Sequence, residues 1–181
     1  MSSPDAVSSP NAVSSPDAVG EAARAAAARA WNVRRAARAD VVAVTAAVRE
    51  LLAELDGTAS ALGAMQAAAR TLIDSPWAGT VLVAETEGEL LGVLAASWQM
   101  AIHVPGSYAL IQDLWVRPDW RDRAVGASLL QELFELARSR RLQRVEVGLP
   151  RESFARFAAT EAFYLGNGFA PNGPRMRRLL A

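Results

Sequence analysis

The sequence predicts one α/β domain, in which helices cover both faces of a mixed β-sheet. Three observations predict it. Segments whose apolar residues recur at helical spacing alternate with short runs rich in β-branched and aromatic residues. Glycine, proline and acidic residues mark the boundaries between these segments. Apolar residues make up 51% of the 181 residues, which is enough for one hydrophobic core.

The expected domain begins with a strand and two helices. Residues 32–38 predict the first strand. Asp40 is a favourable helix N-cap, and apolar residues then recur at helical spacing over 41–55. A second helix is expected over 59–73, because Ser75-Pro76 ends the pattern there.

Three strands follow, and then helices alternate with strands. Glu87-Gly88-Glu89 predicts a tight hairpin, and Pro105-Gly106 predicts the turn before the third strand. A final strand region is expected to open at Gly168-Phe169 and to end over 175–180. The expected elements, by residue range, are strands 80–86, 90–98 and 108–116, helix 126–139, strand 144–149 and helix 153–166. The sheet would therefore have six to seven strands.

The N-terminal segment and the composition limit the classes of function. Residues 2–19 are three copies of a hexapeptide, SSPDAV, SSPNAV and SSPDAV, so we expect a disordered tail over 1–20 and the domain over 21–181. The absence of cysteine and the single histidine, His103, argue against thiolate and multi-histidine metal sites. Balanced charges, 19 against 19, argue against nucleic acid as a partner. No apolar stretch is long enough to span a membrane, and we expect a cytoplasmic protein.

The most informative segment, 114–130, is a strand end, a short loop and the start of an amphipathic helix. A helix N-terminus offers unpaired backbone N–H groups and the positive end of a dipole, which together can hold phosphate oxygens. Arg121 and Arg123 can add charge and paired donors. Gly126 would let a bulky ligand approach the backbone closely. The segment predicts an anion-binding loop.

This segment resembles the coenzyme A loop of the GNAT (N-acetyltransferase) superfamily. Leu114, Val116 and Pro118 match its L-x-V-x-P strand, and residues 121–126 match R/Q-x-x-G-x-G/A except that Ala124 replaces the first glycine. A second signature is similar in its Phe163-Tyr164 and Gly168-Phe169 parts, although Phe157 stands where the family often has asparagine. The resemblance implies the GNAT fold and acetyl-CoA as cosubstrate, with no metal. The residues it implies for binding are Leu114, Trp115, Val116, Arg121, Asp122, Arg123, Ala124, Val125, Gly126, Ala127 and Tyr164.

The resemblance also implies how the acyl group would be transferred. Tyr164 would protonate the leaving thiolate, because the tyrosine of the Phe-Tyr pair often lies beside the sulfur of coenzyme A. Backbone N–H groups of 114–116 would stabilise the oxyanion. Three sources of the base stay open. Asp113 is the only carboxylate in its strand, Glu85 is on a neighbouring strand, and the amine could arrive deprotonated.

The expected reaction is acetylation of a primary amine of a small molecule, by direct attack on the thioester. The family often builds one wall of the acceptor site from the two helices after the first strand, here 40–74, which carry Glu50, Glu54 and Asp56. Two alternatives stay open, acylation of a peptide or protein amine and a non-catalytic acyl-CoA-binding module. A homodimer is compatible with the sequence.

Overall fold

The computed structural model describes residues 31–173, which lie within one compact unit, Trp31–Ala181. The predicted tail at 1–20 and the predicted strand end at 175–180 lie outside the described residues. The elements in chain order are β1 (Asn32–Arg35), the 3-10 helix η1 (Arg38–Asp40), α2 (Val41–Glu54), α3 (Leu62–Asp74), β2 (Gly79–Thr86), β3 (Glu89–Ala101), β4 (Val104–Val116), the 3-10 helix η2 (Pro118–Trp120), α4 (Val125–Ser139), β5 (Val145–Val147) and α5 (Phe157–Gly166).

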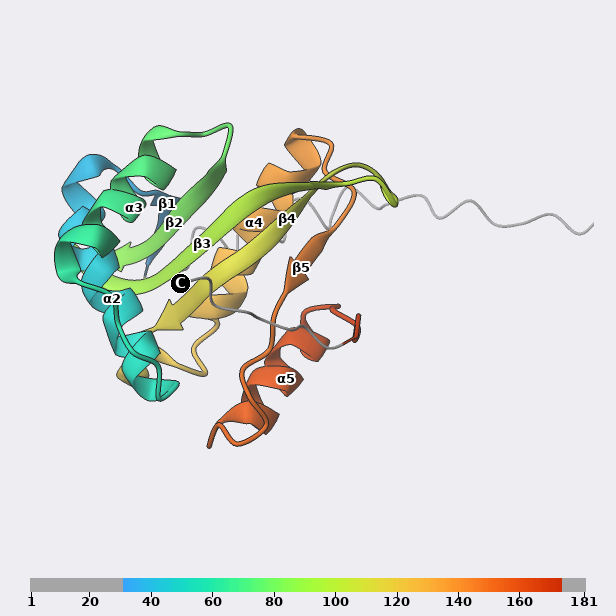
Figure 1. The fold of residues 1–181 in the computed structure, drawn as a ribbon. Coiled ribbons are helices and arrows are strands. Elements are labelled where there is room, and N and C mark those ends of the chain that lie inside the picture. Colours follow the sequence, from blue (N-terminus) through green and yellow to red (C-terminus); the bar gives the residue numbers. More distant parts are fainter. Residues whose placement is uncertain (1–30, 174–181) are drawn as a thin grey trace, which may run out of the picture. The chain divides into compact units, whose positions relative to one another are not determined.

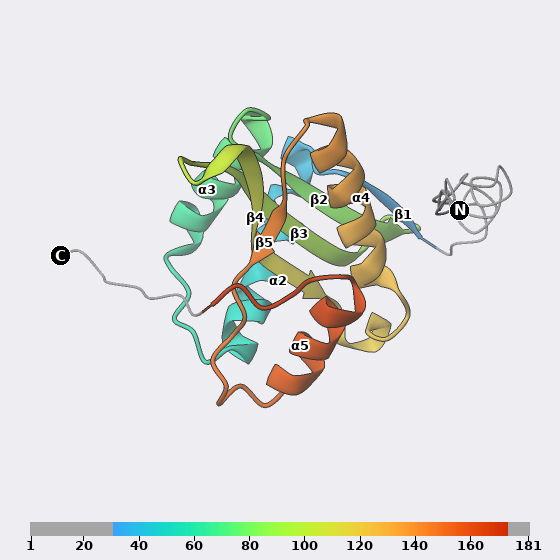
Figure 2. The same cartoon turned by 90° about the vertical axis from the view of Figure 1, so that its right-hand side faces the viewer.

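One sheet organises these elements, with strand order β1-β2-β3-β4-β5. Neighbouring strands from β1 to β4 are antiparallel, and β5 pairs with β4 in parallel. Figures 1 and 2 show α2 and α3 on one face of the sheet and α4 on the other, while α5 lies below the end of β5. The predicted α/β class with helices on both faces is therefore confirmed.

A separate hydrophobic core fills each face. On the α4 face, Tyr164 of α5 packs together with fully buried leucines of the sheet and of α4. These leucines are Leu82, Leu94, Leu129, Leu130 and Leu133. On the other face, Val44 and Ala47 of α2 pack against Val83 and Trp115 of the sheet. Successive side chains of a strand point to opposite faces of the sheet. Because both faces bury apolar surface, the register of each strand determines which of its side chains enter which core.

The predicted hairpin at Glu87-Gly88 is confirmed, and the next turn differs from the prediction. Glu87 and Gly88 both have positive φ, 47° and 83°, as the two central residues of a tight hairpin require. Strands β3 and β4 are 13 residues each, longer than expected, and the turn falls at Ile102-His103 rather than at Pro105-Gly106. Continued pairing up to Ala101↔Val104 extends this hairpin beyond the rest of the sheet (Figure 1).

Three further expectations are corrected. Five strands, rather than six or seven, form the sheet within residues 31–173, and 168–173 contain no strand. The Asp40 side chain does not cap α2; instead it accepts hydrogen bonds from the Ala37 amide at 2.6 Å and from Arg34 at 2.7 Å. Strand β5 is shorter than the predicted 144–149, because the chain turns away from β4 after Val147. No helix within 31–173 is long and apolar enough to cross a membrane.

Candidate active site

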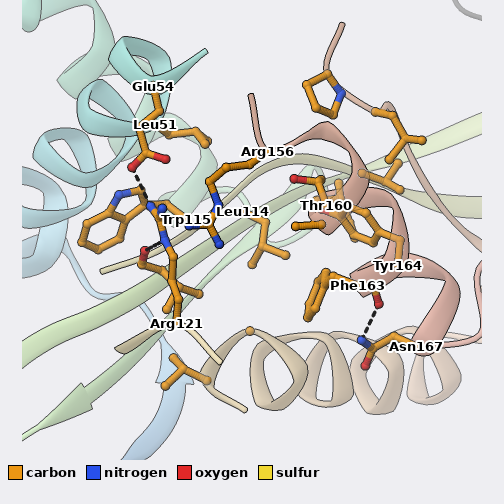
Figure 3. Close-up of a pocket in the computed structure, with 18 of the residues that line it drawn as sticks. Leu51, Glu54, Leu114, Trp115, Arg121, Arg156, Thr160, Phe163, Tyr164 and Asn167 are labelled. Atoms are coloured by element: carbon orange, nitrogen blue, oxygen red, sulfur yellow. Dashed lines mark hydrogen bonds and ion pairs between the residues drawn. The ribbon is translucent and has the colours of Figure 1, made fainter. Parts of the chain in front are cut away.

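A cleft opens where β5 separates from β4. The two strands pair only over 109–111 with 145–147, so the edge of β4 from Gln112 to Val116 has no neighbouring strand on that side. The cleft has a volume of about 540 Å³. Its walls are β4, the N-terminal turn of α4, the C-terminal turn of α2, and α5 with the segment before it (Figure 3). An extended molecule lying in the cleft could hydrogen-bond to the free main chain of β4.

A β-bulge at Gln112 separates the side chains along this edge. Ala95 pairs with Asp113 and Ala96 pairs with Ile111, so Gln112 is the extra residue on β4. Its side-chain amide donates a hydrogen bond to Ser97 Oγ at 2.8 Å. Ile111 belongs to the core on the α4 face, whereas Asp113 lies opposite Ala95, which belongs to the core on the α2–α3 face. Sequence reasoning had no signal for this bulge.

The start of α4 presents a run of backbone N–H groups. No backbone or side-chain acceptor within 31–173 takes a hydrogen bond from the amides of residues 122–127. The first bond in this region is made by the Ser128 amide, which donates to the Ala124 carbonyl at 2.9 Å. Five of the six residues line the cleft, Arg123 being the exception. Unpaired amides at a helix N-terminus form a site for an anion.

The backbone of this loop adopts left-handed conformations at two residues that are not glycine. Ala124, the N-cap of α4, has φ 65° and ψ 8°, and Asp122 has φ 60°. Positive φ brings the Cβ of an L-residue close to its own backbone, and aspartate tolerates this region better than alanine does. The loop therefore keeps at Ala124 a backbone conformation that favours glycine.

Gly126 lines the cleft, as expected, and also makes room for a neighbouring side chain. A Cβ built on it would lie 3.2 Å from Phe163 Cζ and 3.5 Å from Val116 Cγ2. The absent side chain thus makes room for the ring of Phe163 on α5, and not only for a ligand. Phe163 in turn packs edge-on against Tyr164, with ring centroids 5.2 Å apart.

Arg121 lies in the cleft but already has partners. Its Nη2 donates to Glu54 Oε1 at 2.5 Å, and its Nε donates to the Val116 carbonyl at 2.9 Å (Figure 3). Only 18% of the Arg121 side chain and 30% of the Glu54 side chain are exposed. Glu54, an acidic residue of the segment that the resemblance assigns to the acceptor wall, is thus tied to the loop before α4. Arg123 does not line the cleft, and its guanidinium lies 5.3 Å from the ring centroid of Trp120.

The two residues predicted for proton transfer lie on opposite sides of β4. Tyr164 lines the cleft and is 7% exposed, and burial raises the pKa of its phenol well above the usual value. Asp113 does not line this cleft; it faces the α2–α3 side, and burial raises the pKa of its carboxyl. Glu85 is less suited to be a base, because hydrogen bonds from Arg34 at 2.6 and 2.9 Å lower its pKa.

The structure brings together most of the predicted binding residues and adds others. Of the eleven, all but Arg123 line the cleft. Tyr164 is the one α5 residue that the sequence predicted for the site, and the structure adds Arg156, Thr160, Phe163 and Asn167 on the same side of the cleft (Figure 3). The only sequence signal for these residues is their spacing, which places them on one face of a helix. That spacing does not indicate which cavity the face borders. No group of three or more His, Asp or Glu side chains within 31–173 could hold a metal ion.

Comparisons with known proteins agree with this geometry. The model of the Acetyltransferase (GNAT) family matches residues 49–169. No curated protein sequence gives a significant match.

Solved structures with the same fold include three acetyltransferases. An Arthrobacter sp. FB24 protein assigned to the acetyltransferases is 25% identical, with a TM-score of 0.68 over 82% of this chain and 96% of its own. An aminoglycoside acetyltransferase, meta-AAC0020, from an uncultured soil metagenomic sample, solved with sisomicin, is 16% identical, with a TM-score of 0.64 over 84% and 96%. The ribosomal-protein-alanine N-acetyltransferase of Brucella melitensis biovar Abortus 2308 is 14% identical, with a TM-score of 0.66 over 84% and 100%.

Proposed function

Because the chain belongs to the acetyltransferase (GNAT) family, we propose that it is an acetyl-CoA-dependent N-acetyltransferase that acetylates a primary amine of a small molecule. The observation that carries the proposal is the run of unpaired amides at 122–127, located beside the free edge of β4 in one cleft. Coenzyme A combines a diphosphate with an extended, amide-containing arm. The amides suit the diphosphate, and the strand edge suits the arm.

The proposed chemistry uses both sides of β4. An amine approaching from the α2–α3 side would meet Asp113, which would accept its proton, directly or through a water. Backbone N–H groups of 114–116 would stabilise negative charge on the acyl oxygen as the carbon–nitrogen bond forms. Tyr164, in the cleft on the other side, would donate its proton to the sulfur as the carbon–sulfur bond breaks. The phenol would then be reprotonated from solvent.

Burial is compatible with these two roles. Desolvation raises the pKa of Asp113, which moves that carboxyl toward the basicity that a general base needs. Desolvation also keeps Tyr164 protonated at neutral pH. The same apolar surroundings would also raise the pKa of the departing thiol, so the thiolate would be a stronger acceptor for the Tyr164 proton than it is in water.

The acceptor class has two candidates. The neighbour that binds sisomicin supports a small amine, and the ribosomal-protein-alanine acetyltransferase supports the alternative, a protein amine. Both are less than 20% identical to this chain, so what they share with it is the fold. A small amine is our proposal; a non-catalytic acyl-CoA-binding module is the remaining alternative.

Two measurements test the proposal. Acetyl-CoA at 100 times its dissociation constant should stabilise the folded state by about 2.7 kcal/mol, which a thermal-shift titration detects. Release of free thiol is then measured with a panel of aminoglycosides, polyamines and amino acids, and with peptides as the second arm. Binding without thiol release in any arm would favour the binding module, and an absence of acetyl-CoA binding would refute the proposal.

A further inference from the structure

We propose that Arg156 is the cation that closes on the diphosphate of the donor, and that Arg121 is a structural link between α2 and the loop before α4. The inference rests on the proposed use of acetyl-CoA. It reverses the expectation from the loop sequence, which places the phosphate-binding charge on Arg121 and Arg123. The sequence offered no motif around Arg156.

The charge of Arg121 is already compensated within the protein. Its guanidinium donates to the Glu54 carboxylate and to the Val116 carbonyl, and the side chain is largely buried. Glu54 is the last residue of α2, while Arg121 directly follows η2 in the loop before α4. The pair therefore fixes the C-terminus of α2 to the loop. Withdrawing Arg121 to bind a ligand would leave a partly buried carboxylate without its partner, which is costly.

Arg156 is in the opposite situation. It is the only other arginine that lines the cleft within 31–173, it is exposed, and its guanidinium takes part in no hydrogen bond or ion pair with the described residues. As the N-cap of α5 it stands on the wall facing β4 and the α4 loop. Figure 3 shows its side chain directed into the cleft, toward Leu114 and the Arg121–Glu54 pair.

The other arginines next to the loop do not offer a free charge to the cleft. Arg117 donates to both Glu89 and Asp119, at 3.0 and 2.9 Å. Arg123 lies against Trp120 outside the cleft lining. The cation available to an anion bound at the amides of 122–127 would thus be Arg156, on the α5 side of the cleft. A guanidinium can hold two phosphate oxygens at once, so Arg156 suits a diphosphate better than a lysine would.

The test is isothermal titration of coenzyme A into the full chain and into three variants. Arg156→Ala should weaken binding about tenfold, which is the loss of one charge-assisted contact on a partly exposed group. Arg156→Lys should recover part of that loss. Arg151→Ala is the matched control, because Arg151 is also exposed, lies in the same β5–α5 connection and does not line the cleft. It should bind within twofold of the unaltered chain.

The dependence of coenzyme A affinity on ionic strength distinguishes a phosphate contact from a packing contact. The difference between the unaltered chain and Arg156→Ala should shrink as the ionic strength rises from 50 mM to about 0.5 M, since salt screens exposed charges. The inference is overturned if Arg156→Ala binds within twofold of the unaltered chain, if Arg151→Ala loses as much affinity, or if the difference does not depend on salt. Failure of the unaltered chain to bind coenzyme A would instead refute the proposed function.

Discussion

Replacing Ala124 by glycine should stabilise the protein, although glycine in place of alanine usually does the reverse. Ala124 has φ 65° and ψ 8°, a left-handed conformation that costs an L-residue roughly 1–2 kcal/mol. Glycine removes that cost but adds backbone freedom to the unfolded chain, worth about 0.4–1 kcal/mol. The net gain should be about 0.5–1 kcal/mol, or a rise of about 1–4 °C in Tm for a chain of this size.

The assay is urea denaturation followed by circular dichroism, compared at constant m-value. Ala127→Gly is the matched control: it makes the same chemical change three residues later, inside α4 and without positive φ. There the substitution should cost about 0.5–1 kcal/mol. If both variants lose stability alike, the left-handed conformation at Ala124 carries no strain and the argument from its φ angle is refuted.

Three further predictions concern the two sides of β4 and the link to α2. Tyr164→Phe should lower kcat by about 10–100-fold and change acetyl-CoA affinity less than threefold, whereas an equal loss of affinity in titrations would make Tyr164 a packing residue. The pKa of Asp113 is raised from 3.8 by burial, so its own contribution to the free energy of unfolding falls as the pH rises from 3.8 through its folded-state pKa; denaturation at several pH values should show Asp113→Asn gaining stability relative to the unaltered protein over that interval. Arg121→Ala should lower the free energy of unfolding by about 1–2 kcal/mol, and a double-mutant cycle with Glu54→Gln should give a coupling of about 1 kcal/mol; additive losses would show that the pair contributes nothing.

The distribution of functional groups over two faces gives the proposed reaction its geometry. The groups proposed to bind the donor line the cleft, while Asp113 lies outside the cleft lining and faces α2 and α3. The bulge at Gln112 makes this arrangement possible, because it shifts the alternation of side chains along β4 by one residue. Asp113 consequently shares a face with Trp115, and Ile111 stays in the other core.

Periodicity, turn residues and one loop motif were sufficient to determine the fold class, most element boundaries and the position of the loop that is proposed to bind an anion. Each of these depends on neighbours in the chain, so the sequence alone carries the information. The spacing from Leu114 to Gly126 predicted a helix N-terminus one short loop after a strand, and helix geometry then requires unpaired amides there. The positive φ at Ala124 occurs at the motif position where the family has glycine, and only the structure shows it.

The partners of the charged side chains were decided only by the tertiary structure. Glu54 and Arg121 are 67 residues apart, and nothing local to either indicates that they meet. The same holds for Phe163, whose ring occupies the space that Gly126 leaves open, and for Arg156, whose free charge is recognised only when the opposite wall is known. Spacing along a chain determines which face of an element a side chain occupies, but the charge available to a ligand depends on what the rest of the fold brings to that face.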